Sequence, residues 1–334
     1  VQGVISNSGS IASTEGIALE VGSNTQSIAN GGSLSGTSGL VVNGTVTGDV
    51  TSSGPITATA GNCIDIVGVL TGSLANTGTI TATGTGVRLG AGVTGALTNG
   101  GTITAQDAGV AVLGNIGGQF ANTGAISGRA AGVVVTGNVQ GVISNSGSIA
   151  SADGVALMVG GNTQGIVNSG SLSGIIGLGV GGIVDGDVTN SGSITATGVG
   201  VLLGNVGTVT NSGTITASGL GIFADDAQSV INSGTITVIG DEAIGIFVNG
   251  TASVVNRGSV IANGTGSVAI NLAGAAQTLV NSGSIASDNV AIASNGGDRV
   301  IFAEGSSVTG AIASTGTGST LHFGAAAGVT PTSN

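Results

Sequence analysis

The sequence predicts an all-β protein in which short parallel strands stack turn upon turn as a β-solenoid. One seven-residue frame, of the form apolar, any, Asn, small, Gly, small, aliphatic, occurs thirteen times at intervals of 21–25 residues, mostly 23. Between the frames, apolar and polar residues alternate with the period of a strand. A repeat of this length buries its apolar face only by stacking on its neighbours. We therefore expect one solenoid of about 14 coils.

The third position of the frame is Asn in twelve of the thirteen copies, and Ser52 occupies it in the other. Stacking places this position of each turn above that of the turn before. Buried Asn amides can then hydrogen-bond to one another and stabilise the stack. The predicted structural ladder comprises Asn7, Asn30, Asn76, Asn99, Asn122, Asn145, Asn168, Asn190, Asn211, Asn232, Asn256 and Asn281.

The Gly two residues after this position is present in all thirteen frames, from Gly9 to Gly283. Asn and Gly adopt positive φ more readily than other residues. We therefore expect the Asn-x-Gly segment to form a corner through positive φ, with β geometry on both sides of it.

The aliphatic position four residues after the Asn is expected to point inward and to form a stacked column. This column includes Ile11, Ile80, Ile103, Ile149, Ile194, Ile215 and Ile236. A further apolar pair follows most corners, as in the segment Gly109-Val110-Ala111-Val112. Each turn should therefore contain about three short strands.

The repeats divide the chain into three predicted parts. Residues 1–295 form regular turns, and the thirteen residues 139–151 repeat 1–13, so a six-coil block, 1–138, is duplicated from 139. Residues 296–323 keep strand character without the Asn corner and are expected to form terminal irregular coils. Residues 324–334 read as a tail or linker. Because residue 1 is Val, we expect that a leader has been removed.

The composition narrows the possible partners. The chain contains 68 Gly among 334 residues, yet its mean hydropathy is +0.55, which is more apolar than a disordered Gly/Ser chain. Its net charge of −11 argues against nucleic acid as a partner. No apolar run is long enough for a membrane helix, so we expect no membrane insertion by this segment. The lone Cys63 is expected to be a small buried apolar residue.

A family resemblance rests on the Asn-Ser-Gly-Ser/Thr-Ile frames and on the closing segment DRVIFAEGSSVTGAI, residues 298–312. Both resemble the passenger domains of bacterial autotransporters, the type V secretion proteins. The resemblance implies a right-handed parallel β-helix that is exported from a bacterium and displayed at its surface. It also implies an adhesive or structural role, with a host or cell-surface ligand as the partner.

Catalytic residue sets are sparse in this sequence. It contains one His, His322, and no Gly-x-Ser-x-Gly elbow, which argues against a Ser-His-Asp hydrolase. Paired acids could serve glycoside hydrolysis, but the chain has only five Phe as aromatic platforms. These acid pairs are Asp185/Asp187, Asp225/Asp226 and Asp241/Glu242. We expect neither enzymatic activity nor a cofactor.

Phe223 and Phe247 occupy matching places in neighbouring turns, each directly after an inward Ile, and should lie side by side on the outer surface. Acidic residues lie near them in the sequence and are weak candidates for a Ca²⁺ site. They are Asp225, Asp226, Asp241 and Glu242. The competing interpretation is a solvated acidic corner beside a stacked Phe pair.

Three functions remain open from the sequence. The first is a non-enzymatic extracellular structural or adhesive passenger. The second is a subunit of a self-assembling extracellular filament, which would stack end to end because Val1 opens inside the repeat and leaves a coil end exposed. The third is a polysaccharide-acting β-helix enzyme, which requires a cleft and a clustered set of acids.

Overall fold

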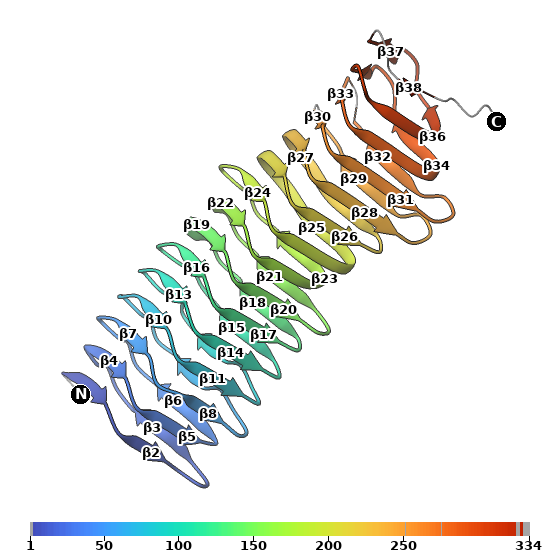
Figure 1. The fold of residues 1–334 in the computed structure, drawn as a ribbon. Helices are drawn as coiled ribbons and strands as arrows, with labels where there is room; N and C mark the ends of the chain where they lie inside the picture. The colour runs from blue at the N-terminus through green and yellow to red at the C-terminus, as the bar shows by residue number, and fades with distance from the viewer. Residues whose placement is uncertain (1–2, 251, 275, 325–327, 330–334) are drawn as a thin grey trace. The chain divides into compact units, whose positions relative to one another are not determined.

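The computed structural model describes residues 3–250, 252–274, 276–324 and 328–329, and these residues form strands and turns without any helix. The chain forms two units: unit 1 contains the residues up to 166 together with 170–175, and unit 2 contains 167–169 and the residues from 176 onward. In each unit, strands that are about one repeat apart in the sequence lie side by side (Figure 1). Every strand pairing within the units is parallel, as the repeat predicts. No membrane-crossing helix is found in the part of the chain that the structure describes.

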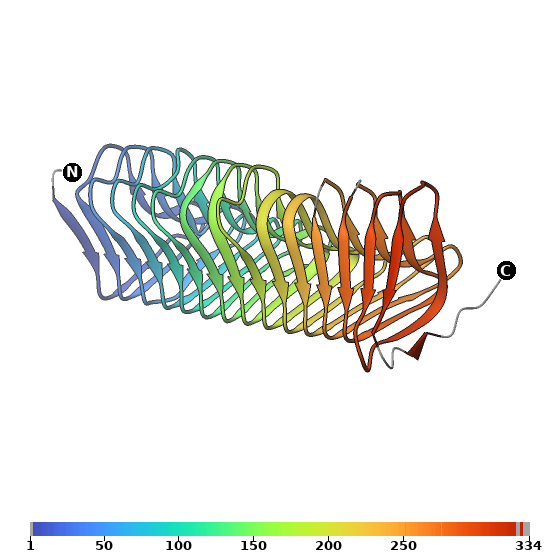
Figure 2. The same cartoon turned by 90° about the horizontal axis from the view of Figure 1, so that it is seen from above.

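Each turn of unit 1 has three strands, and Figure 2 shows these turns following one another from blue to green. The first strand of each turn is β1 (Val4–Asn7), β4 (Ser27–Asn30), β7 (Val50–Ser52), β10 (Leu74–Asn76), β13 (Leu97–Asn99), β16 (Phe120–Asn122) or β19 (Val139–Asn145). The second is β2 (Ser10–Ala12), β5 (Ser33–Gly36), β8 (Ile56–Ala58), β11 (Thr79–Ala82), β14 (Thr102–Ala105), β17 (Ala125–Gly128) or β20 (Ser148–Ser151). The third is β3 (Ile17–Val21), β6 (Ser38–Val42), β9 (Ile64–Ile66), β12 (Val87–Leu89), β15 (Ala108–Val112), β18 (Ala131–Val135) or β21 (Val155–Val159).

Strands β22 (Thr163–Asn168) and β23 (Ser171–Val180) contain the residues at which the chain passes from unit 1 to unit 2. Unit 2 repeats the three-strand turn, but several of its strands run through a corner and merge. Its strands are β24 (Val188–Asn190), β25 (Ser193–Asn211), β26 (Thr214–Ala217), β27 (Leu220–Asn232), β28 (Thr235–Ile239), β29 (Ile244–Val248), β30 (Ser253–Asn256), β31 (Ser259–Asn263), β32 (Val268–Leu272), β33 (Thr278–Asn281), β34 (Ser284–Ser294), β35 (Arg299–Phe302), β36 (Ser307–Ser314), β37 (Thr320–Phe323) and β38 (Gly328–Val329).

The pairing register places equivalent frame positions opposite one another. Ile80 on β11 pairs with Ile103 on β14, and Ile215 on β26 pairs with Ile236 on β28. Both strands of the first pair alternate exposed and buried side chains, and Ile103 is only 1% exposed. The inward aliphatic column is therefore confirmed within each unit for the buried members from Ile80 to Ile236, whereas Ile11 in the first turn is half-buried. Burial of each such side chain contributes about 1.5–3 kcal/mol relative to an exposed one.

The corner glycines serve a different purpose from the predicted one. Among the described residues, none of the thirteen frame glycines has positive φ. Instead, a Cβ on Gly124 would overlap the carbonyl oxygen of Gly101 in the turn before, and Gly147 stands in the same relation to Gly124. The expectation of positive-φ corners is wrong, because glycine is needed here for close backbone approach between turns.

Parallel stacking continues through residues 296–323, with register shifts between β34 and β36. Strand β35 pairs in register with β33 and β37, and β36 pairs with β34. Phe302 occupies the position that Asn holds in earlier turns, is buried, and stacks on Phe323 with ring centroids 5.3 Å apart. Of the predicted tail, only Gly324 and residues 328–329 are described; the rest of it, like Val1, lies outside the described residues.

Candidate functional site

The frame asparagines form columns of buried amides in both units. In unit 1, Asn99 donates from Nδ2 to Asn122 Oδ1 at 2.8 Å, and also to the carbonyl oxygen of Gly101 at 3.1 Å. The same inter-turn bond, 2.7–2.9 Å long, joins Asn7 to Asn30, Asn76 to Asn99, Asn122 to Asn145, Asn168 to Asn190, Asn190 to Asn211, Asn211 to Asn232, Asn232 to Asn256 and Asn256 to Asn281. Each of these amides donates to the following turn, so their dipoles align and strengthen one another.

The amide column of unit 1 has a gap at Ser52. Asn30 Nδ2 lies 3.5 Å from Ser52 Oγ, and Ser52 Oγ lies 3.4 Å from the carbonyl oxygen of Gly54; both distances are longer than those of well-formed hydrogen bonds. The buried Asn76 Oδ1 consequently has no hydrogen-bond partner among the described residues. A serine side chain is too short to reach the next amide, so the column is interrupted there.

The four acidic candidates for a Ca²⁺ site are exposed, and three of them accept hydrogen bonds from different donors. Asp225 Oδ1 accepts from Asn249 Nδ2 at 3.0 Å, and Asp226 Oδ2 accepts from Asn205 Nδ2 at 3.4 Å. Asp241 Oδ1 accepts from the backbone N–H of Thr265 at 3.1 Å, and Glu242 is exposed with φ of 57°. In the described ranges, no group of three or more His, Cys, Asp or Glu side chains could hold a metal ion. The structure therefore does not bring the four acids together as a metal site.

Phe223 and Phe247 lie in register on β27 and β29, as expected from the sequence. Their rings stack with centroids 4.9 Å apart and planes 6° from parallel, and both side chains are half-buried on the outer surface. Leu202 precedes them in the same outward column, and Asn271 follows them. The two rings cover each other's facing sides, so these sides are not open to a ligand.

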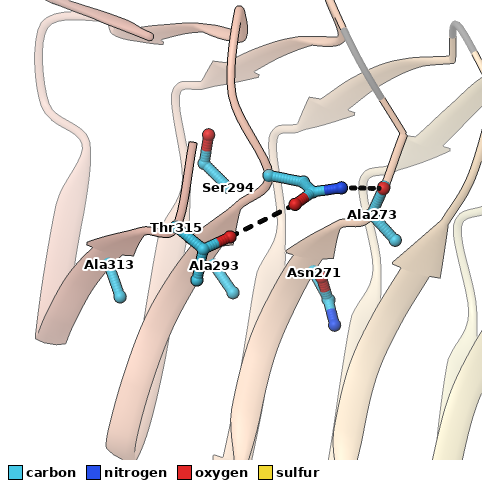
Figure 3. Close-up of a pocket in the computed structure, with 7 residues that line it drawn as sticks. Asn271, Ala273, Ala293, Ser294, Ala313 and Thr315 are labelled. Carbon is cyan, nitrogen blue, oxygen red and sulfur yellow. Dashed lines mark hydrogen bonds between the residues drawn. The ribbon is translucent and has the colours of Figure 1, made fainter. Parts of the chain in front are cut away.

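The same outward column continues from Asn271 to Ala293 and Ala313, and the small alanines leave a recess of about 360 Å³. Figure 3 shows Asn271, Ala293 and Ala313 in a row on neighbouring strands. The lining residues are Asn271, Ala273, Ala293, Ser294, Asn295, Ala313 and Thr315.

Two hydrogen bonds fix the rim of this recess. Asn295 Nδ2 donates to the carbonyl oxygen of Ala273 at 3.0 Å, and Thr315 Oγ1 donates to Asn295 Oδ1 at 3.2 Å (Figure 3). The Asn271 amide is half-buried and makes no hydrogen bond with the other residues drawn in Figure 3. The recess therefore presents an unused amide beside a polar rim whose orientation is already fixed.

Cys63, His322 and Asp187 are not among the residues that line this recess. Cys63 is 0% exposed, its thiol donates to the carbonyl oxygen of Thr81 at 3.1 Å, and burial raises the pKa of the thiol to about 12. His322 is exposed on β37. Asp187 Oδ1 accepts from the backbone N–H of Thr208 at 3.0 Å. The thiol therefore stays protonated at neutral pH, and the Asp187 carboxylate is used to hold a neighbouring turn.

A buried carboxylate that sequence reasoning missed lies in unit 2. Asp298 is 0% exposed; its Oδ1 accepts from the backbone N–H of Gln277 at 2.8 Å, and its Oδ2 accepts from Ser294 Oγ at 2.6 Å. Ser294 Oγ also lies 2.9 Å from Ser319 Oγ. The sequence contains a signal for this burial. Asp298 follows the same alternation as the inward Val300 and Phe302, so its side chain falls on the inner face. The cluster joins successive turns and therefore has a structural role.

No protein-family model, curated protein or solved structure matches this chain.

Proposed function

We propose that this chain is a non-enzymatic extracellular segment, displayed at a bacterial surface, in which each solenoid unit serves as a stiff structural or adhesive support. The observation that carries the proposal is the in-register stacking of the inward aliphatic and amide columns within each unit. Backbone and side chains of one turn are both hydrogen-bonded to the next, so bending would have to break several contacts at once. A repetitive structure of this kind supports display better than it supports a moving catalytic site.

The short separation along the sequence between contacting residues supports export. Amide-column partners are separated by 21 residues between Asn190 and Asn211 and by 25 between Asn256 and Asn281. Each turn therefore needs only its immediate neighbour in order to fold, and a solenoid can grow turn by turn. A chain that leaves the cell unfolded could fold in this way as it emerges. The extracellular location itself is supported by the resemblance of the Asn-Ser-Gly frames to autotransporter passengers.

Surface digestion of intact producing cells tests the proposal. Cells would be treated with a non-specific protease and probed with an antibody raised against the purified chain, with a periplasmic and a cytoplasmic protein as controls for lysis. We expect the antibody signal to fall on intact cells while both controls survive. A signal that is protected until the cells are broken open would contradict surface display.

Sedimentation of the purified full chain separates the support from the filament alternative. A displayed support remains a single low-mass species as the protein concentration rises. Growth into fast-sedimenting polymers, seen as fibres by negative-stain microscopy, would favour end-to-end assembly. An assay against a panel of polysaccharides addresses the third alternative, and release of reducing ends would contradict a non-enzymatic role.

A further inference from the structure

We propose that the recess on unit 2, lined by Asn271, Asn295, Thr315 and three alanines, binds a neutral sugar ring of the pyranose type. The recess arises from side-chain size along one outward column. Phe247 is followed in register by Asn271 and then by Ala293, so the column falls from a ring to a methyl group within two turns. The main chain keeps its pairing through this step, and only the side chains become smaller.

The polar groups around the recess match a hydroxylated ligand. The Asn271 amide offers two N–H donors and a carbonyl acceptor, and none of them is hydrogen-bonded to another lining residue (Figure 3). Asn295 keeps one amide hydrogen after its bond to Ala273, and Thr315 Oγ1 keeps its lone pairs after donating to Asn295. A sugar hydroxyl both donates and accepts, so vicinal hydroxyls could use both kinds of group.

The charge and size of the recess define the ligand class further. None of the seven lining residues carries a charge, so an anionic or cationic ligand would lose hydration there without gaining an ion pair. The methyl groups of Ala273, Ala293 and Ala313 give an apolar surface for the C–H face of a ring. A volume of about 360 Å³ lies at the lower end of the range for small-molecule sites, which suits one ring and not a long chain.

Sugar binding would be a function in addition to structural support. It is measured on the purified chain, so the result does not depend on where the protein is displayed. Its test uses the full chain and saturation-transfer NMR with the methyl glycosides of glucose, galactose, mannose and N-acetylglucosamine, with glucuronate as the charged comparison. We expect transfer to at least one neutral glycoside, with millimolar affinity typical of a shallow site, and none to glucuronate. No transfer to any of the four neutral glycosides would overturn the proposal.

Two variants test whether the sugar binds in the recess. Ala293→Phe should fill it and reduce the affinity roughly tenfold or more, and the fold should accept the ring because Phe247 and Phe223 already occupy this column. Asn271→Ala removes the unused amide and should weaken binding without blocking the space. The control is Ala111→Phe, an outward position of the same kind in unit 1. Unchanged binding in Ala293→Phe, with circular dichroism matching the parent chain, would also overturn the proposal.

Discussion

Ser52 is the only residue other than Asn at the third position of the thirteen frames, and it interrupts the column of buried amides. Asn76 Oδ1 is buried and unpaired among the described residues because the serine side chain is too short to reach it. We predict that Ser52→Asn would restore the amide column between Asn30 and Asn76. One regained buried hydrogen bond should raise the free energy of unfolding by about 1 kcal/mol, measured by urea denaturation.

The matched control for this repair is Thr51→Asn, which adds the same side chain at the neighbouring exposed position of β7. It should leave the urea midpoint almost unchanged. If Ser52→Asn is no more stable than Thr51→Asn, the gap at Ser52 does not limit stability.

Cys63 gives a pH prediction. Burial raises the pKa of the folded thiol from its ordinary 9.0 to about 12, so the unfolded chain loses this proton first. The stability linked to the thiol is therefore fully present below pH 9.0 and is lost as the pH rises toward 12. The sequence has no Lys and no Tyr, so Cys63 is the only side chain with an ordinary pKa in this window.

The measurement is the free energy of unfolding against pH for the parent chain and for Cys63→Ala. We expect the parent to lose stability between pH 9 and pH 11 and the variant to stay nearly level, although it starts lower because a buried atom has been removed. Parallel curves for the two proteins would show that the folded thiol ionises like an exposed one.

At the scale of the element, the corner between the first and second strands is set by how closely successive turns approach. A Cβ on Gly124 would overlap the Gly101 carbonyl oxygen, which is backbone and cannot rotate away. We predict that Gly124→Ala forces the two turns apart and lowers the free energy of unfolding by about 1–3 kcal/mol. Denaturant unfolding would measure this loss.

Gly9 supplies the comparison, because it holds the same frame position and a Cβ there would meet nothing within 4 Å. Gly9→Ala should therefore be nearly neutral. An equal loss in the two variants would point to a general requirement for glycine flexibility, and close approach between turns would no longer explain the frame.

The regular elements could be predicted from the sequence because the stacking rule is encoded in every turn. A fixed Asn-to-aliphatic spacing determines both the phase of each strand and its register, as the Ile80–Ile103 pairing shows. The reason for the glycine could not be predicted, since overlap with the turn before depends on the distance between two backbones. Positive φ was the only local explanation that the sequence offered.

The recess and the Asp298 cluster were beyond the sequence for a related reason. The outward column runs through Phe247, Asn271, Ala293 and Ala313 at spacings of 24, 22 and 20 residues. The pairing of β34 with β36 also contains register shifts. Without the structure, nothing fixes which residues of these turns share a column, so the drop in side-chain size could not be located. The alternation of Asp298 with Val300 and Phe302 indicates its burial, but not the partners that it meets in the cluster.

At the scale of the whole molecule, each unit is built from turns that touch mainly their nearest neighbours. The stability of such a protein is approximately a sum over turns and the interfaces between them. A complete turn should therefore be removable from the interior of unit 1, provided that the residues brought together have equivalent places in the frame. Asn76 and Asn99 are equivalent, since they pair directly in adjacent strands.

We predict that deleting residues 77–99, which joins Asn76 to Gly100, leaves a folded unit 1 that is only modestly less stable. The remaining β10 takes the place of β13 beneath β16, because Leu74 and Leu97 occupy the same register position. The comparison deletion is 77–86, which is shorter but removes β11 and interrupts the inward column that contains Ile80. Far-UV circular dichroism and urea unfolding should show β structure and a cooperative transition for the whole-turn deletion, with a much lower midpoint for the shorter one. If the shorter deletion is tolerated equally well, stability does not depend on preserving whole turns, and the nearest-neighbour account of this solenoid is wrong.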